Sequence, residues 1–213
     1  MREILFWGAT GQAKVLHEAI YGTNICLVAL IDNRPLPSPI PGMPLLNGEA
    51  GLDAWLAQRG GSNNLYAAVA VGGAHGRDRI MLMDLLKERG LTLLTLVHRT
   101  AFVAHSAMIG EGCQILAQSA VCTHTSLGRG VIVNTAASVD HDCVIGDGVH
   151  LGPGARVAGE VTIGARAFIG TGAVILPHIT IGQDAIIGAG AVVTKDVAPS
   201  VTMIGNPAHS KAQ

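Results

Sequence analysis

A six-residue repeat fills the second half of this chain and limits its possible folds more than any other sequence feature. Aliphatic residues stand at every sixth position, and all fifteen are Ile, Val or Leu: Ile109, Ile115, Val121, Leu127, Val133, Val139, Ile145, Leu151, Val157, Ile163, Ile169, Ile175, Ile181, Ile187 and Val193. A period of six fits neither the 3.6-residue α-helix nor a heptad, and the stretch is rich in glycine and β-branched residues. It indicates a repeat architecture, in which each unit buries its apolar face against its neighbours.

The positions around each aliphatic residue complete the pattern. The residue two positions earlier is small or β-branched, and the residue that follows is often glycine. We interpret each hexapeptide as one flat face and one corner of a triangular prism, with the aliphatic side chain inside and glycine relieving the corner. Three hexapeptides then close one coil, so residues 18 apart stack at a strand spacing of about 4.8 Å. The repeat therefore predicts five coils of an all-β parallel β-helix.

The first hundred residues predict a smaller α/β domain. Buried apolar runs that end in glycine or polar residues alternate with helical segments, which favours a parallel, Rossmann-like sheet. The expected strands are 3–8, 26–31, 66–71 and 91–97, and the expected helices are 15–20, 52–58 and 77–89. We therefore expect a nucleotide-sugar-binding domain at 1–100 and a β-helix domain with a C-terminal cap at 101–213.

Three loops follow the first three strands of the predicted sheet: 8–14, Asp32-Asn33 and Gly72-Gly73. Ligands of parallel sheets bind at the carboxyl ends of the strands, where a glycine turn before a helix offers N–H groups to a phosphate. An acidic residue about 20 positions later binds a ribose hydroxyl or a base. The full G-x-G-x-x-G motif is absent, because Thr10 and Ala13 replace two of its glycines. The alternative is that the glycines only form a tight strand–helix turn.

The charge balance excludes two classes of partner. Lys and Arg number 14 against 15 Asp and Glu, so no basic surface for nucleic acid or a membrane is expected. No charge-free apolar window reaches the roughly 18 residues that a membrane span needs. The four cysteines form no C-x-x-C pair, which favours reduced thiols and a cytoplasmic protein.

The strongest candidate for chemistry is His141, which lies between Asp140 and Asp142. The 18-residue stacking places His141 beside Thr123 and Gly159, and Gly159 leaves open space and a bare backbone N–H next to the imidazole. An adjacent carboxylate orients an imidazole and raises its basicity. Alternation along a strand predicts that both aspartates point to the same side. The alternative is a surface histidine beside solvated carboxylates.

Other histidines define the limits of this site. His124 stacks in phase with Asp142, Glu160 and His178, which we interpret as a solvated polar edge. His150 lies half a coil from His141, so the two meet only if two prisms pack side by side, as in a trimer. A metal site is not expected, because His105 and His141 are two coils apart and Gly146 occupies the position of a third ligand.

At this point the sequence resembles a family, the bacterial nucleotide-aminosugar N-acetyltransferases of the bacillosamine, perosamine and sialic-acid pathways. The resemblance covers nearly the whole chain. It rests on the 8–14 turn, Asn134-Thr135, the 139–146 segment with its Asp-His-Asp sequence, and the 188–193 and 205–208 runs. One departure concerns the turn, where the family often has histidine at the position of Gln12.

The resemblance implies a left-handed β-helix, a homotrimer with sites at the subunit interfaces, and acetyl-CoA as co-substrate without a metal. It implies His141 as general base with Asp142 as its helper, and Gly159 and Asn134 at the oxyanion. It places acetyl-CoA at His150, Thr171 and Ala189. It places the nucleotide sugar at Gly11, Gln12, Ala13, Lys14, Asp32, Asn33 and Gly72.

We therefore expect direct acetyl transfer from acetyl-CoA to the 4-amino group of a nucleotide-linked 4-amino-4,6-dideoxyhexose, with GDP-perosamine favoured and a UDP-linked sugar next. In this hypothesis His141 removes a proton from the attacking amine, and Gly159 stabilises the developing oxyanion. No cysteine has the surroundings of an acyl carrier. The alternatives are a sialic-acid-type O-acetyltransferase and a non-catalytic trimer that binds a sugar nucleotide or a metal.

Overall fold

The computed structural model describes residues 1–211 and divides into two compact units. The first contains Met1–Val71 and Met81–Leu94, and the second contains Gly72–Ile80 and the chain from Thr95 onward. The chain passes for the last time from the first unit to the second between Leu94 and Thr95. The short Gly72–Ile80 segment belongs to the second unit, together with the repeats. No helix within the described residues has the length and apolarity that a membrane span requires.

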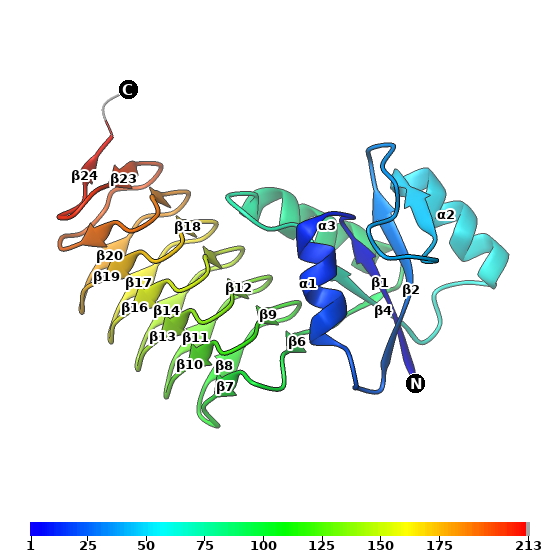
Figure 1. Ribbon diagram of the computed structural model, residues 1–213, viewed down its shortest axis with the longest axis horizontal. Helices are drawn as coiled ribbons and strands as arrows, with labels where there is room; N and C mark the ends of the chain where they lie inside the picture. The colour runs from blue at the N-terminus through cyan, green and yellow to red at the C-terminus, as the bar shows by residue number, and fades with distance from the viewer. Residues whose placement is uncertain (212–213) are drawn as a thin grey trace. The chain divides into compact units, whose positions relative to one another are not determined.

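The first unit is a five-stranded parallel sheet with the order β3-β2-β1-β4-β5, accompanied by helices (Figure 1). Its strands are β1 Arg2–Trp7, β2 Ile25–Asp32, β3 Leu45–Asn47, β4 Leu65–Val69 and β5 Thr92–Leu93. Its helices are α1 Gly11–Ala19, α2 Gly48–Arg59 and the part of α3 (Gly76–Glu88) from Met81 onward. This strand order is Rossmann-like and confirms the predicted α/β class.

The central strand β1 shows why this sheet forms. Ile4, Leu5 and Phe6 have no exposed surface, as expected for a parallel strand covered on both faces. The strand ends at Gly8, whose φ of +115° is readily available only to glycine. A Cβ there would also collide with the carbonyl group of Ala70, the residue after β4. Gly8 therefore lets the chain turn tightly from β1 toward α1.

Two details of the first unit differ from the sequence prediction. The expected strand 91–97 divides, because Leu94 donates its N–H to Ala67 of the sheet and Leu96 donates to Cys113 of the repeats. The strand β3 was not predicted, since it has only three residues and directly follows the proline-rich loop. Both errors concern very short strands, whose partners only the tertiary structure supplies.

The second unit is a parallel β-helix whose coils follow one another from green to red in Figure 1. Seventeen two-residue strands, β6 to β22, recur every six residues and form three parallel sheets. The β6 face contains β6 Leu96–Val97, β9 Gln114–Ile115, β12 Ile132–Val133, β15 His150–Leu151, β18 Phe168–Ile169, β21 Ile186–Ile187, β23 Thr202–Ile204 and the antiparallel β24 His209–Ser210.

The other two faces complete each coil. The β7 face contains β7 Phe102–Val103, β10 Ala120–Val121, β13 Ser138–Val139, β16 Arg156–Val157, β19 Val174–Ile175 and β22 Val192–Val193. The β8 face contains β8 Met108–Ile109, β11 Ser126–Leu127, β14 Val144–Ile145, β17 Thr162–Ile163 and β20 Thr180–Ile181. Paired strands are 18 residues apart, as in Val121 with Val139, so the predicted stacking is confirmed.

From β7 to β22, the second residue of each strand points into the prism and forms its core. The repeated aliphatic residues from Ile115 to Val193 are at most 4% exposed, and Ile109 packs against them. The small residues two positions earlier, such as Ala137 and Cys143, are equally buried. A core built from Ile, Val, Leu and Ala explains how this chain manages with 3% aromatic residues.

The repeated glycines have a different role from the predicted one. Glycines directly after the aliphatic residue do not adopt a positive φ. A Cβ at Gly146 would instead lie 2.6 Å from the backbone nitrogen of Ala165 in the next coil. The left-handed position lies two residues later and accepts other residues, including Ala136 at φ 55° and Asp142 at φ 58°. Glycine after the aliphatic residue therefore permits close stacking of the coils.

Candidate functional site

His141 lies on the corner between the β7 and β8 faces, directly after β13. The carboxylate of Asp140 accepts the backbone N–H of His141 at 2.8 Å, and the imidazole Nδ1 lies 2.8 Å from Oδ2 of Asp142. The expectation that strand alternation orders this segment is wrong, because β13 ends at Val139 and Asp142 adopts a left-handed φ of 58°. The turn directs the carboxylate of Asp142 back onto the imidazole.

The hydrogen bond from His141 Nδ1–H to Asp142 fixes the tautomer of the neutral imidazole. A carboxylate only accepts hydrogen bonds, so Nδ1 carries the proton and Nε2 keeps its lone pair in the neutral ring. This hydrogen bond raises the pKa of His141, and the charges of Asp140, Asp142 and Glu160 act in the same direction. The imidazole is about half exposed. The ring is therefore an accessible base with a free Nε2 lone pair.

Gly159 lies against the imidazole of His141. A Cβ built on Gly159 would stand 2.5 Å from both Cε1 and Nε2 of that ring, so only glycine fits beside it. Within residues 1–211, the backbone N–H of Gly159 makes no hydrogen bond. Gly159 therefore lies against the imidazole of His141 on the adjacent coil, as the 18-residue spacing predicts.

The residues in phase with Asp142 form an exposed polar edge. His124, Asp142, Glu160 and His178 all adopt left-handed φ values between 56° and 62°, and all four are exposed. The imidazole Nδ1 of His178 lies 3.2 Å from Oε2 of Glu160. This ladder is exposed, as expected; the side chain of Asp142 contacts the imidazole of His141, and the backbone N–H of Glu160 donates to the His141 carbonyl at 2.9 Å.

A different edge carries the residues that were predicted to bind acetyl-CoA. Asn134, Thr171 and Ala189 follow the strands β12, β18 and β21 and occupy the corner between the β6 and β7 faces, hereafter the Asn134 edge. Backbone hydrogen bonds stack this edge, since Gly190 donates to Thr171. Thr171 and Ala189 are exposed and Asn134 is half-buried. Within one chain, this edge and the His141 corner are separate.

His150 points outward from β15 but is only 5% exposed. Its Nδ1 lies 3.2 Å from the carbonyl oxygen of Gly73, and its Nε2 lies 3.1 Å from Nδ2 of Asn134. Its ring meets that of Phe168 edge-on at a centroid distance of 5.4 Å. Burial, followed by the charge of Arg79, lowers the pKa of His150 to about 4. The contact of His150 with acetyl-CoA stays a prediction, and its observed partner is Asn134.

The predicted phosphate loop begins α1 in the first unit. Gly11, Gln12 and Lys14 lie in the first turn of this helix, where Gly11 and Lys14 are exposed and Gln12 is half-buried, whereas Ala13 is buried. The side chain of Thr10 does not cap the helix, so its first N–H groups face outward with the positive end of the helix dipole.

Asp32 holds this loop from the end of β2. Its Oδ2 accepts the N–H of Ala9 at 3.1 Å, and Arg34 binds the carboxylate through its backbone N–H and its guanidinium at 2.9 to 3.1 Å. The Arg34 guanidinium lowers the pKa of Asp32. Asp32 is 6% exposed and therefore orders the turn, while the neighbouring Asn33 is exposed. Gly72 belongs to the second unit.

Two kinds of comparison identify relatives of this fold. Residues 124–159 and 160–195 each match the family described as bacterial transferase hexapeptide (six repeats). The chain is 36% identical to PerB from Caulobacter crescentus, a structure with CoA and GDP-perosamine, over 99% of this chain and 97% of that one, with a TM-score of 0.90. This match extends through both units. The chain belongs to the nucleotide-aminosugar N-acetyltransferase family.

Other solved members agree with this assignment. The acetyltransferase domain of PglB from Neisseria gonorrhoeae, in complex with acetyl coenzyme A, is 34% identical over 99% of both chains, with a TM-score of 0.87. WeeI from Acinetobacter baumannii is 30% identical over 98% of this chain and 99% of that one, with a TM-score of 0.85. The fold of this family member is therefore an α/β Rossmann-like domain followed by a left-handed parallel β-helix.

Sequence reasoning missed Arg79 in this family member. This side chain has no exposed surface, and its guanidinium donates to the carbonyl oxygens of Gly130 and Gly148 at 2.7 and 2.5 Å. The only signal in the sequence was an arginine next to Ile80, inside the apolar pattern of the expected helix 77–89. An amphipathic helix normally directs such a charge to solvent, so nothing in the pattern predicted its burial.

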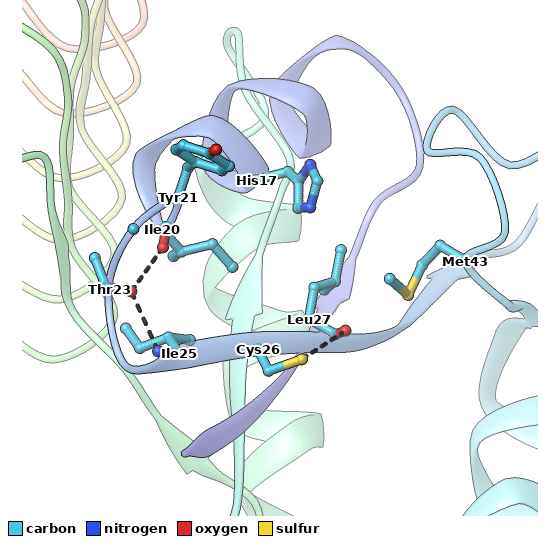
Figure 2. A pocket seen from close by; sticks show the side chains of 9 residues that line it. His17, Ile20, Tyr21, Thr23, Ile25, Cys26, Leu27 and Met43 are labelled. Atoms are coloured by element: carbon cyan, nitrogen blue, oxygen red, sulfur yellow. Dashed lines mark hydrogen bonds between the residues drawn. The ribbon is translucent and has the colours of Figure 1, made fainter.

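A small pocket in the first unit contains none of the predicted site residues. Its volume is about 280 Å³, and it lies between the end of α1 and the start of β2 (Figure 2). Its lining is His17, Ile20, Tyr21, Gly22, Thr23, Ile25, Cys26, Leu27 and Met43. The pocket is at the amino end of β2, whereas Asp32 ends that strand. No three His, Cys, Asp or Glu side chains within residues 1–211 group as metal ligands.

Proposed function

We propose that this chain transfers the acetyl group of acetyl-CoA to the 4-amino group of a nucleotide-linked 4-amino-4,6-dideoxyhexose. The observation that carries the proposal is the arrangement of His141, which is oriented by Asp142 at 2.8 Å and packed on Gly159. A neutral imidazole with a free Nε2 lone pair is the base that an attacking amine requires. GDP-perosamine is the favoured acceptor, supported by the similarity to PerB, which was solved with CoA and GDP-perosamine.

The reaction balances without a covalent enzyme intermediate. The amine nitrogen bonds to the thioester carbonyl carbon, the C–S bond breaks, and CoA leaves as the thiol. His141 Nε2 takes a proton from the nitrogen and returns it to the departing sulfur. The N–H of Gly159, which makes no hydrogen bond within residues 1–211, is assigned to stabilise the developing oxyanion. Burial raises the pKa of the Cys113 thiol to about 11 and raises that of Cys143, so neither thiol suits an acyl carrier.

The two substrates are assigned to different parts of the chain. In this proposal, acetyl-CoA lies along the Asn134 edge, where Thr171 and Ala189 are exposed. The nucleotide sugar lies at the loop of Gly11, Gln12, Ala13 and Lys14, with Asp32, Asn33 and Gly72. The first turn of α1 suits a diphosphate, because its outward N–H groups and Lys14 attract anions.

A homotrimer would complete the site. His141 and the Asn134 edge lie on different corners of one prism, so a single chain cannot bring both to one thioester. A neighbouring subunit that presents its Asn134 edge to His141 solves this problem with closed three-fold symmetry. We infer a cytoplasmic location, where acetyl-CoA is made and where thiols stay reduced, in keeping with the four free cysteines.

An acceptor screen tests the proposed function. CoA release is measured with acetyl-CoA and GDP-perosamine, with UDP-linked 4-amino-4,6-dideoxy sugars, and with the matching 4-hydroxy sugars. We expect turnover with an amino sugar and none with its hydroxy counterpart, because a neutral amine is a far stronger nucleophile than an alcohol and its nitrogen becomes readily deprotonated by His141 once it has attacked. Turnover only with hydroxy sugars would identify an O-acetyltransferase. No CoA release with any acceptor would contradict the proposal.

A further inference from the structure

Arg79 joins two coils of the β-helix at the point where His150 begins a strand. Its Nε donates to the Gly130 carbonyl at 2.7 Å, and its Nη2 donates to the carbonyls of Gly148 and Val149 at 2.5 and 3.4 Å. Gly130 and Gly148 are 18 residues apart and therefore stack in consecutive coils. The guanidinium thus holds the backbone of the two residues that precede His150.

The hydrogen bonds around His150 determine which ring nitrogen carries the proton. The Gly73 carbonyl at 3.2 Å only accepts, so Nδ1 is the donor. Asn134 Oδ1 accepts the N–H of Thr135 at 2.8 Å, which turns the NH₂ group of Asn134 toward Nε2 of His150. Nε2 must then accept a hydrogen bond. The chain from Thr135 through Asn134 and His150 to Gly73 is consistent only with a neutral imidazole.

Protonation of His150 would break this chain. A proton on Nε2 would face the NH₂ group of Asn134, and two donors repel each other. The amide would have to turn over to present Oδ1 to the imidazolium, and it would then lose its hydrogen bond with Thr135. The Oδ1 and NH₂ groups of Asn134 would exchange positions on the Asn134 edge. A neutral His150 therefore keeps the amide of Asn134 in one orientation.

The residues around His150 favour the neutral ring. The outward neighbours on the same face, Gln114, Ile132 and Phe168, carry no charge. The charge that acts on His150 comes from Arg79, and together with burial it lowers the pKa of His150 to about 4. Arg79 itself has a pKa lowered by burial to about 10, so it stays a cation at neutral pH. The nearby Cys113 thiol, with its pKa raised to about 11, stays neutral.

We propose that Arg79 is a positioning residue of the acyl-transfer site, which clamps the two coils beside His150 and keeps the Asn134 amide in one orientation. This proposal rests on the proposed function, because it assigns acetyl-CoA to the Asn134 edge. Asn134 touches the substrate in this scheme, while Arg79 acts only through His150. Arg79 thereby extends the range of pH over which the Asn134 amide keeps this orientation.

Nitrogen-detected NMR of the histidines tests the proposal without any assay of activity. In the wild-type trimer we expect the Nδ1–H tautomer of His150 and no titration above pH 5. Arg79→Gln keeps donors for the carbonyls and removes the charge, so the pKa of His150 should rise by about one unit or more. Arg79→Lys keeps the charge, and Arg156→Met removes an exposed cation from the β7 face. Neither should raise the pKa of His150.

The outcomes separate this proposal from the proposed function. An Nε2–H tautomer in the wild type, or equal pKa values of His150 in Arg79→Gln and Arg79→Lys, would overturn the role of Arg79. If Arg79→Gln fails to fold, the wild-type tautomer and the Arg79→Lys titration still decide. In the acetyl-transfer assay, Arg79→Gln should lose about two-fold more kcat/KM for acetyl-CoA at pH 5 than at pH 8, because a His150 pKa raised by about one unit leaves about half of the imidazole protonated at pH 5. A purely structural role would lower activity equally at both pH values. Absence of CoA release with every acceptor would remove the proposed function and leave the NMR result intact.

Discussion

Individual residues set the chemistry of this molecule through their immediate contacts. His141 is an ordinary exposed histidine except for two neighbours, the carboxylate of Asp142 at 2.8 Å and the bare backbone of Gly159. Asp142 fixes the tautomer of His141 and raises its pKa. Gly159 leaves space for the reacting group, and its N–H is the proposed donor. His150, on a different face of the prism, has the opposite environment, since burial and a cation keep it neutral. The same residue type therefore serves two roles.

Loss of the proposed base should reduce the rate of transfer. We expect His141→Asn to lower kcat by roughly 10²–10⁴-fold with little change in the KM for acetyl-CoA, because a general base acts in the transition state. Steady-state kinetics with the acceptor found in the screen measures this effect. His124→Asn, on the solvated edge, is the control and should keep near-normal kcat. A His141→Asn variant with near-normal kcat would remove His141 from the mechanism.

The partner of His141 should set the pH dependence. The Asp142 hydrogen bond raises the pKa of His141 above its usual 6.5. A base must be neutral to act, so activity is lost as the pH falls through this raised pKa. In Asp142→Asn the acid limb of the kcat profile should move to lower pH, toward 6.5, while the maximum rate falls. An unchanged acid limb would show that another group controls it.

Gly159 should tolerate no side chain. We expect Gly159→Ala to lower kcat at least about ten-fold, since its methyl group would displace the imidazole and a small misplacement costs up to about 10²-fold. The φ of Gly159 is not positive, so the backbone itself accepts alanine. Gly60→Ala, where a Cβ meets nothing within 4 Å but the φ of +83° strains the backbone, controls for lost stability outside the site and should keep near-normal kcat. Unchanged kinetics in Gly159→Ala would disprove the close contact.

The β-helix is built from short secondary-structure elements, the two-residue strands β6 to β22. Inner strands of the β-helix pair with the strands 18 residues before and after them, and from β7 to β22 the second residue enters the core. Stability is then distributed along the coils as a sum of neighbouring interfaces. The alternation of buried and exposed residues makes the strand β17 a direct test, because its two residues have opposite environments.

The inward and outward residues of β17 should differ in their contribution to stability. Ile163 is 1% exposed, so Ile163→Ala should lower the free energy of unfolding by about 2–5 kcal/mol through lost burial and a cavity. Thr162 is exposed, and Thr162→Ala should change it by less than about 0.5 kcal/mol. Urea unfolding of both variants measures the difference. Similar losses in the two variants would refute the inward orientation of the repeat.

The whole molecule combines a Rossmann-like unit with a β-helix whose proposed reactive groups lie on separate edges. The 72–80 segment contacts His150, a titratable residue of the β6 face that is buried. It leaves the His141 corner exposed. These two features give predictions for stability against pH and for assembly.

The buried His150 should make the protein less stable in acid. Its folded-state pKa of about 4 lies below the usual 6.5, so the unfolded chain binds the proton more tightly. The contribution of His150 is complete above pH 6.5 and is lost as the pH falls from 6.5 toward 4, by up to about 3 kcal/mol. Urea unfolding at pH 7.5 and pH 5 should show a smaller pH dependence in His150→Gln than in the wild type. Equal dependence would mean that His150 titrates normally.

Complementation tests whether the site is shared between subunits. His141→Asn and Asn134→Ala should each be nearly inactive as homotrimers. When the two variants are co-expressed at equal amounts, they assemble at random into trimers. An intact His141 then lies beside an intact Asn134 edge at about a quarter of the interfaces. We therefore expect activity near a quarter of the wild-type value in the mixture. Activity no higher than that of the single variants would place both residues in sites within one chain.

The sequence by itself determined the parts of this protein that depend on a fixed repeat. The six-residue period defined the inward residues, the 18-residue stacking and the proximity of His141 to Gly159, because neighbouring coils impose the same separation everywhere. The alternation of strands and helices likewise predicted the Rossmann-like sheet. Errors were confined to details, such as the division of the strand 91–97 at Thr95.

Only the tertiary structure decided the contacts that follow no period. Gly73 meets His150 across 77 residues, and Arg79 meets Gly148 across 69. The carboxylate of Asp32 likewise accepts hydrogen bonds from Ala9 and Arg34, which the sequence did not predict. Periodic patterns specify which face of a strand is apolar, but they do not specify which distant segment covers a polar residue. The burial of His150, and with it the role proposed for Arg79, follows from packing alone.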